Sequence, residues 1–274
     1  MKKGVFFLFL TAFCWSLAGI LIRVNHVTGL AIASLTSAFA LVASLLIYHQ
    51  PLVFNKRTII VGISQCMMSM TFIYANQLTT VANALILQYT STIFVLIYQS
   101  IDLHHLPSKR QLGIISMVII GMVMFFFDSL SPSSLFGNLL AVISGALFGL
   151  DFYFNNKEDG DAFTSCLLAY TLSFIIGAIV LHYLPAMSPI EWVSVASYGL
   201  ITLALGGIFY SMGIQFTDAF TANLICMLEI FLAPLWAFLL FHETISGLSL
   251  IGALIVISGI VLNLLFDFGI IEQS

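Results

Sequence analysis

The chain alternates between ten long apolar runs and short polar segments that carry most of its Pro and charged residues. A helix needs about 20 mostly apolar residues to cross the hydrocarbon core of a bilayer. Continuous apolar runs indicate helices rather than the strands of a membrane barrel, in which polar and apolar residues alternate. The pattern therefore predicts an all-α membrane protein with ten transmembrane helices, at 5–22, 30–48, 58–76, 83–101, 111–127, 135–154, 163–183, 192–212, 220–241 and 248–266.

The composition supports a lipid environment for these helices. Hydrophobic residues make up 61% of the chain and charged residues only 7%, whereas soluble domains carry about 25% charged residues. The bilayer is thus the expected partner, and so sparse a charge gives no surface for nucleic acid. Because the connections are too short for a soluble domain, any activity must lie among the helices.

The basic residues predict the orientation, because cytoplasmic loops carry an excess of Lys and Arg. If the N-terminus is cytoplasmic, Arg23 alone lies on the outer side. The cytoplasmic side then holds the other seven basic residues, namely Lys2, Lys3, Lys56, Arg57, Lys109, Arg110 and Lys157. We therefore expect a multi-pass protein of a bacterial-type cytoplasmic (inner) membrane, with both termini inside.

Residues 1–133 and 134–274 resemble one another in the order of their marker residues. Trp15 aligns with Phe148, and Gly121 aligns with Gly259. Five helices in each half would invert the second half relative to the first. Inverted five-helix repeats are typical of carriers, in which the two halves exchange conformations. This argument for transport rests on architecture and is partly an analogy.

Three segments resemble the ten-helix EamA-type carriers of the drug/metabolite transporter superfamily. They are the first-helix sequence at 12–16, the segment 227–237 with its Ala-Pro-Leu-Trp-Ala sequence, and the glycines Gly252 and Gly259. The resemblance spans essentially the whole chain. It implies a small-molecule carrier whose cavity lies between helices 1, 3, 4, 6, 8 and 9.

The chain also departs from that family pattern. Ile230 replaces the proline expected after Glu229, Leu96 stands where a helix-four proline is expected, and His105 replaces a terminal Glu. Because family members carry amino acids, sugars, nucleotides, cationic drugs or vitamins, these departures leave the substrate open.

Glu229 is an acidic residue close to the middle of a predicted span. An ionised carboxylate there costs about 2.5–3.5 kcal/mol on insertion scales. Glu229 can serve as a counter-charge for a cationic substrate, as a proton-coupling group, or as a protonated acid in a helix–helix hydrogen bond. Trp236 lies two turns further on the same face, so the ring and the carboxylate can surround one cation.

Asp151 is the other acidic residue inside a span, near the cytoplasmic end of helix six, and Phe148 shares its face. A substrate contact and an interfacial carboxylate in contact with water both remain open for it. Ser91 aligns with Glu229 and Ala18 with Asp151, so neither acid is repeated. This asymmetry suggests that the substrate, rather than the scaffold, requires the acids.

Further candidates for a cavity are polar and aromatic, although packing explains each of them singly. They are Trp15, Tyr74, Asn76, Gln88 and Ser91. No cysteine or histidine spacing forms a metal motif, so we expect neither a metal nor another cofactor.

The chain lacks the motifs of an enzyme. His242-Glu243 has no second zinc-binding His, and neither a P-loop nor a nucleophile turn is present. The sequence therefore predicts a secondary-active transporter working by alternating access, coupled to protons through Glu229, with a lean to amine, cationic or zwitterionic substrates. The alternatives are a non-catalytic membrane scaffold or sensor and a facilitative channel. The sequence does not decide whether the protein is a monomer or a homodimer.

Overall fold

The computed structural model describes residues 2–22, 25–129, 134–241 and 246–271, and it is built of helices. Arg23, the end of the first repeat at 133, and the His242-Glu243 pair lie outside the described residues. The α-helices are α1 (Lys2–Ser16), α2 (Ala18–Ile22), α3 (Gly29–Ile47), α4 (Lys56–Leu78), α5 (Val81–Gln88), α6 (Ser91–Leu103), α7 (Lys109–Phe126), α8 (Leu135–Asn155), α9 (Ala162–Leu181), α10 (Pro189–Ser197), α11 (Gly206–Ile214), α12 (Ala219–Cys226), α13 (Glu229–Phe241) and α14 (Gly247–Asp267).

The predicted spans are confirmed. Within the described residues, ten helical stretches are long and apolar enough to cross a membrane. Four of them contain an interruption or a change of helix type. Span one consists of α1 and α2, span four of α5 and α6, and span nine of α12 and α13. Span eight consists of α10, a π-helical segment (Tyr198–Leu205) and α11.

Polar residues in the connections determine where several spans begin. Asn55, Ser108 and Ser188 each accept a hydrogen bond from the backbone N–H three residues later, and the side chain at that position bonds back. These capping boxes satisfy N–H groups that a helix start leaves without partners. The short polar connections therefore fix where α4, α7 and α10 start.

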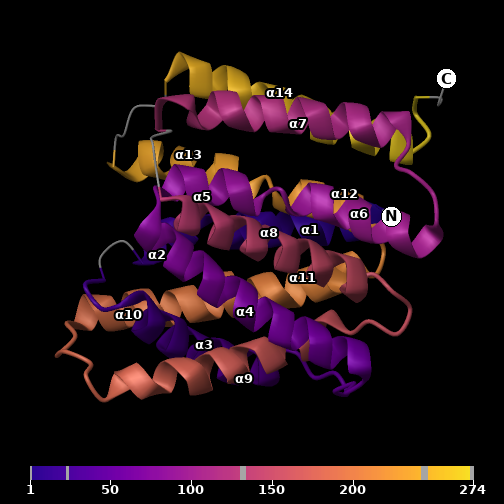
Figure 1. Ribbon diagram of the computed structural model, residues 1–274. Helices are drawn as coiled ribbons and strands as arrows, with labels where there is room; N and C mark the ends of the chain where they lie inside the picture. The colour runs from indigo at the N-terminus through magenta and orange to yellow at the C-terminus, as the bar shows by residue number, and fades with distance from the viewer. Residues whose placement is uncertain (1, 23–24, 130–133, 242–245, 272–274) are drawn as a thin grey trace.

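Both chain ends lie at the same end of the bundle (Figure 1). Helices α1, α4 and α7 begin at this end and α8 finishes there, so the seven basic residues singled out by the sequence gather at it. We call it the basic end of the bundle.

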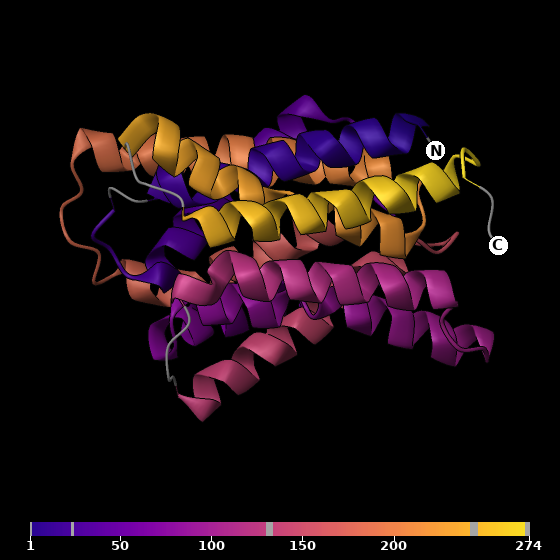
Figure 2. The same ribbon diagram turned by 90° about the horizontal axis from the view of Figure 1, so that it is seen from above.

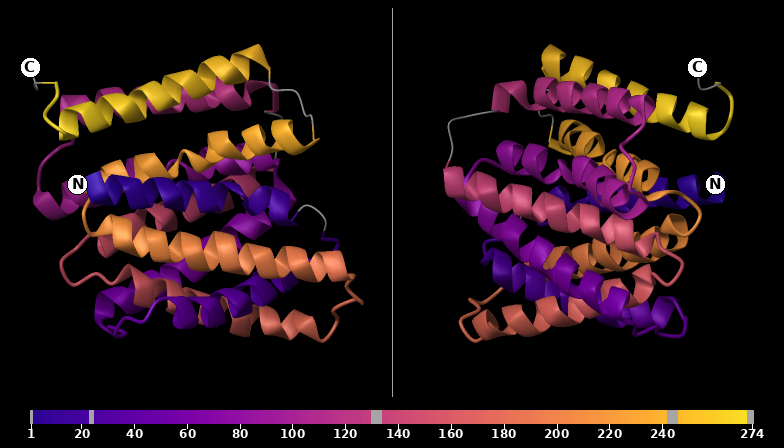
Figure 3. Two further views of the ribbon diagram at one scale, coloured as in Figure 1. Left: turned by 180° about the vertical axis from the view of Figure 1, so that it is seen from behind. Right: turned by 45° about the vertical axis from the view of Figure 1, so that its right-hand side comes forward.

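Helices from the two halves of the chain pair with one another. α7 packs on α14 and α3 on α9 at opposite edges, while α4 packs on α8 and α1 on α11 between them (Figures 1 and 3). The α7–α14 pair forms one outer layer when the molecule is seen from above (Figure 2). The third span of the first half (α4) packs on the first span of the second half (α8). In the same way, the third span of the second half (α11) packs on the first span of the first half (α1), as expected for two equivalent halves.

Glycines allow the closest of these helix contacts. A Cβ at Gly145 or Gly149 of α8 would lie 2.6 Å or 2.7 Å from a backbone oxygen of residues 88 or 91. A Cβ at Gly206 would lie 2.7 Å from the Trp15 ring nitrogen. Gly19 does not have this role, because a Cβ there would meet nothing within 4 Å.

Replacing Gly121 by leucine is expected to destabilise the α7–α14 pair. A Cβ there would lie 2.7 Å from Val256 Cγ2 and 2.8 Å from the Gly252 carbonyl oxygen. Overpacking of this kind costs about 1–3 kcal/mol or more. The matched control is Gly113→Leu on the same helix, where a Cβ would meet nothing within 4 Å. Thermal unfolding in detergent measures both, and equal melting temperatures for the two variants would contradict this packing.

Candidate substrate and coupling site

Spans four and nine are interrupted at equivalent positions of the two halves. Near each break a backbone N–H donates to the carbonyl oxygen three residues earlier instead of four. Thr90 N–H donates to Leu87 O at 3.3 Å, and Leu228 N–H donates to Ile225 O at 3.0 Å. The alignment of Ser91 with Glu229 makes these breaks counterparts. Interrupted helices at corresponding positions of two repeats are the strongest pointer to a carrier's binding site.

The two breaks meet through a hydrogen bond. The Tyr89 hydroxyl, from the break in span four, donates to the Glu229 carboxylate, at the break in span nine. Tyr89 is buried and Glu229 is half-buried. Glu229 is also the first residue of α13, where the positive end of the helix dipole favours a carboxylate. The acid predicted from the sequence is therefore held between the halves by a hydroxyl rather than by a basic side chain.

A chain of aromatic ring contacts extends from Tyr89. The Phe148 ring lies 6.2 Å from the Tyr89 ring and 6.0 Å from the Trp15 ring, measured between centroids. Tyr210 of α11 lies 5.8 Å from Trp15, and Phe152 of α8 lies 5.1 Å from Phe148. The structure thus brings Trp15, Phe148 and Glu229 together from spans one, six and nine.

Gln88 and Ser91 flank the break in span four and join it to other spans. Gln88 Nε2 donates to Ser144 Oγ of α8 at 3.0 Å. Ser91 and Asn223 exchange hydrogen bonds at 3.2–3.3 Å, and Thr92 Oγ1 donates to Asn223 Oδ1 at 2.6 Å. These contacts hold span four against spans six and nine beside the Tyr89–Glu229 bond.

The other three candidates on α4 and α13 have different surroundings. Trp236 Nε1 donates to Ser16 Oγ at 2.9 Å, so this ring contacts α1 rather than the Glu229 carboxylate. Asn76 donates to a backbone oxygen of its own helix at 2.9 Å, and Tyr74 is 45% exposed. The structure does not gather Trp236, Tyr74 or Asn76 around Glu229, and a role for them stays a prediction.

Asp151 is not the interfacial carboxylate that one interpretation of the sequence allowed. Only 3% of the residue is exposed, and neither carboxylate oxygen has a hydrogen-bond partner. That interpretation is wrong because α4 packs along α8 and Tyr210 of α11 contacts the Asp151 backbone, which the apolar pattern of α8 alone does not reveal.

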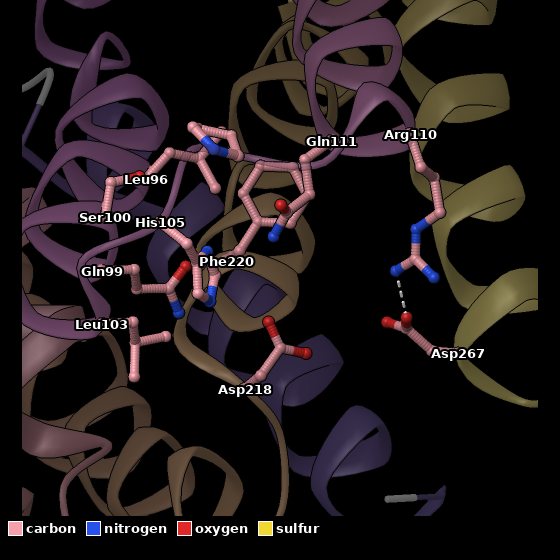
Figure 4. A pocket seen from close by; sticks show the side chains of 11 residues that line it. Leu96, Gln99, Ser100, Leu103, His105, Arg110, Gln111, Asp218, Phe220 and Asp267 are labelled. Carbon is pink, nitrogen blue, oxygen red and sulfur yellow. Dashed lines mark hydrogen bonds and ion pairs between the residues drawn. The ribbon is translucent and has the colours of Figure 1, made fainter.

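A cavity of about 260 Å³ opens at the basic end, between α6, α7, α12 and α14 (Figure 4). Arg110 on α7 is ion-paired with Asp267 on α14, and burial raises the pKa of Asp218 beside them. None of the site residues expected from the sequence lines this cavity. We therefore treat it as separate from the Tyr89–Glu229 site.

Sequence reasoning missed Tyr89 and Asn223. Asn223 is fully buried within an apolar span, and that isolated amide was the available signal. Tyr89 gave no comparable signal, since aromatic residues are common in membrane helices.

Both halves of the chain, residues 2–127 and 135–265, match the model of the EamA-like transporter family. The chain belongs to this family. A solved structure titled "Crystal structure of protein" is similar to it with a TM-score of 0.82 and 13% sequence identity, covering 97% of this chain and 98% of the other. At that identity the likeness shows the fold alone. No curated protein matches the chain significantly.

Membership in the EamA-like transporter family confirms the resemblance found in the sequence. It makes the chain a multi-pass membrane transporter of small solutes and groups it with transporters rather than enzymes.

Proposed function

We propose that the protein is a secondary-active carrier that moves a small amine, cationic or zwitterionic solute by alternating access, with Glu229 as the coupling group. One observation carries the proposal, namely that the breaks in spans four and nine meet in the Tyr89–Glu229 hydrogen bond. Any movement of one half against the other must rearrange this contact. A solute or a proton that competes for the carboxylate thereby biases the halves toward one arrangement.

The same proposal assigns the topology. Residues 1–133 and 134–274 are the two inverted repeats, and the termini lie in the cytoplasm of a bacterial-type cell. The reciprocal packing of α4 on α8 and α1 on α11 supports the repeats. The basic end supports the orientation, because cytoplasmic segments are rich in Lys and Arg.

Contacts at the basic end support a state closed on that side. Lys157 Nζ lies 2.5 Å from the Asp102 carboxylate at the end of α6. Arg57 pairs with Asp159, and Arg110 pairs with Asp267. These ion pairs tie loops and helices of both halves together, so a cytoplasmic opening has to break them.

The surroundings of Glu229 favour a substrate with an amino group. An ammonium ion can pair with the carboxylate, while the faces of Trp15 and Tyr210 attract cations. Helices α6 and α13 both begin at the breaks, and helix starts attract anionic groups of a substrate. A zwitterion would use both features, and a simple amine only the first.

Substrate binding is tested by a thermal-shift screen of amino acids, amines, nucleosides and vitamins on the purified protein. We expect amines or zwitterions to raise the melting temperature, and stabilisation by anions alone would contradict the proposal. The solute that binds is then used in proteoliposomes with and without a pH gradient.

In that assay Glu229→Gln is expected to abolish the stimulation of uptake by the pH gradient, because the amide cannot exchange a proton. Asp128→Asn, an exposed acid beyond α7, is the matched control and should keep the stimulation. Full gradient-driven uptake by Glu229→Gln would show that Glu229 does not couple protons.

A further inference from the structure

A second polar centre lies inside the bundle and has more hydrogen-bond acceptors than donors. Asp151 Oδ1 and Oδ2, Asn155 Oδ1 and Gln65 Oε1 are four buried oxygens without a hydrogen-bond partner. Buried polar atoms are nearly always paired, and an exception calls for a water, an ion or a functional reason. Three side chains from two packed helices, α4 and α8, share this deficit.

The donors of these side chains are used elsewhere. Asn155 lies one turn beyond Asp151 on α8, and its Nδ2 donates to Tyr210 Oη at 3.3 Å. Gln65 Nε2 donates to Cys166 Sγ at 3.6 Å. The neighbouring Ser64 hydroxyl faces Asp151 but donates to a backbone oxygen of α8 at 3.2 Å. Among the described residues, these contacts leave Asp151 only the Ser64 hydroxyl as a donor, and that hydroxyl is shared with a backbone oxygen of α8.

The titratable groups around Asp151 do not supply a positive charge. The titratable side chains near Asp151 are Tyr98 of α6, Cys166 of α9 and Tyr210 of α11, and none of them is basic. Tyr98 donates to a backbone oxygen of α8 at 3.0 Å. None of the ion pairs found among the described residues includes Asp151. An ionised carboxylate in these surroundings lacks compensation, which is costly in a low-dielectric interior.

We propose that Asp151, Asn155 and Gln65 form a binding site for a monovalent metal cation of the sodium class. Carboxylate and amide oxygens are the ligands that hard cations prefer. One carboxylate balances one positive charge. Among the described residues no group of three or more His, Cys, Asp or Glu gathers, so Asp151 is the single charged ligand of this site.

A cation satisfies the centre better than a proton does. A proton on Asp151 converts a single oxygen into a donor and leaves the remaining acceptors competing for that one hydrogen. A cation contacts several oxygens at once and neutralises the charge. Carriers built from repeats commonly hold a coupling ion in this way, within the bundle beside the substrate.

The cation site is distinct from the Glu229 site but is connected to it. Phe148 lies one turn before Asp151 on α8 and packs against Tyr89, the partner of Glu229. Tyr210 contacts both Asn155 and the Trp15 ring. An ion held by Asp151, Asn155 and Gln65 would therefore hold α4 against α8 beside these rings. Its role as a coupling ion rests on the proposed function, whereas its binding does not.

The test measures the melting temperature of the purified protein at constant pH and ionic strength while choline chloride is replaced by NaCl, LiCl or KCl. We expect Na⁺ to raise the melting temperature by several degrees, on the order of 3 °C, at saturation. Asp151→Asn should remove the rise, and Gln65→Leu should increase the Na⁺ concentration needed by at least about tenfold. Asp128→Asn should keep the rise, because this exposed acid lies beyond α7 and outside the site.

Three results would overturn the cation site. They are equal melting temperatures in all salts, a full Na⁺ effect in Asp151→Asn and Gln65→Leu, and stabilisation by acidic pH alone. The last would assign a proton to Asp151. If the protein transports a solute but Na⁺ has no effect, the cation site is wrong and the proposed function stands. If Na⁺ binds but no solute is transported, the proposed function is wrong and the cation site stands.

Discussion

Substitution of Tyr89 by phenylalanine is expected to slow uptake of the transported solute by about 10-fold to 100-fold while leaving the fold intact. The hydroxyl donates to the Glu229 carboxylate at the contact between the two breaks. A hydrogen bond to a charged group contributes about 1.5–3 kcal/mol, and each 1.4 kcal/mol changes a rate or an equilibrium tenfold. Without this bond, the halves lose the hydrogen bond that joins the two breaks.

A double-mutant cycle separates this effect from a general disturbance of packing. Tyr89→Phe and Glu229→Gln should each slow uptake, and the double variant should be no slower than the worse single variant, because both remove the same bond. Tyr183→Phe, an 81% exposed tyrosine, serves as the control and should transport normally. Effects that simply add would mean that the Tyr89–Glu229 bond plays no part in transport.

The spans could be predicted from the sequence because lipid imposes a length and a polarity on every crossing helix. All ten predicted spans agree with the helical stretches to within a few residues. The interruptions could not be predicted in the same way. Tyr89 lies between Gln88 and Thr90, and Leu228 precedes Glu229, but neither break carries the glycine or proline that would mark an interrupted helix in the sequence.

The candidate site shows where sequence reasoning stops. Glu229 stands out because a carboxylate is rare at this depth, whereas Trp15 was expected only as a cavity candidate and Phe148 only as a residue on the face of Asp151. Tyr89, the partner of Glu229, lies in the break between α5 and α6, and no local sequence pattern predicts the direction of its side chain. Trp236 shares a helical face with Glu229 in principle, yet its ring nitrogen bonds to Ser16. Periodicity places a residue on a face but does not select its partner on another helix.

Arg110→Ala is expected to lower the free energy of unfolding by about 3 kcal/mol, because it removes one partner of a largely buried ion pair. The side chains of Arg110 and Asp267 are 20% and 11% exposed. Arg110 Nη2 also donates to Asn263 Oδ1 at 3.1 Å, and Thr221 Oγ1 donates to Asp267 at 2.7 Å. The network joins α7, α12 and α14, so the variant leaves an unpaired carboxylate and an unpaired amide oxygen inside it.

Arg57→Ala is the matched control at the same end of the bundle. Its ion pair with Asp159 is also formed, but the two side chains are 37% and 58% exposed. Water screens such a pair, whose contribution to stability is about 0–1 kcal/mol. Unfolding of both variants in mixed detergent micelles should therefore show a large loss for Arg110→Ala and a small one for Arg57→Ala. Equal losses would mean that burial of the Arg110–Asp267 pair does not determine its contribution to stability.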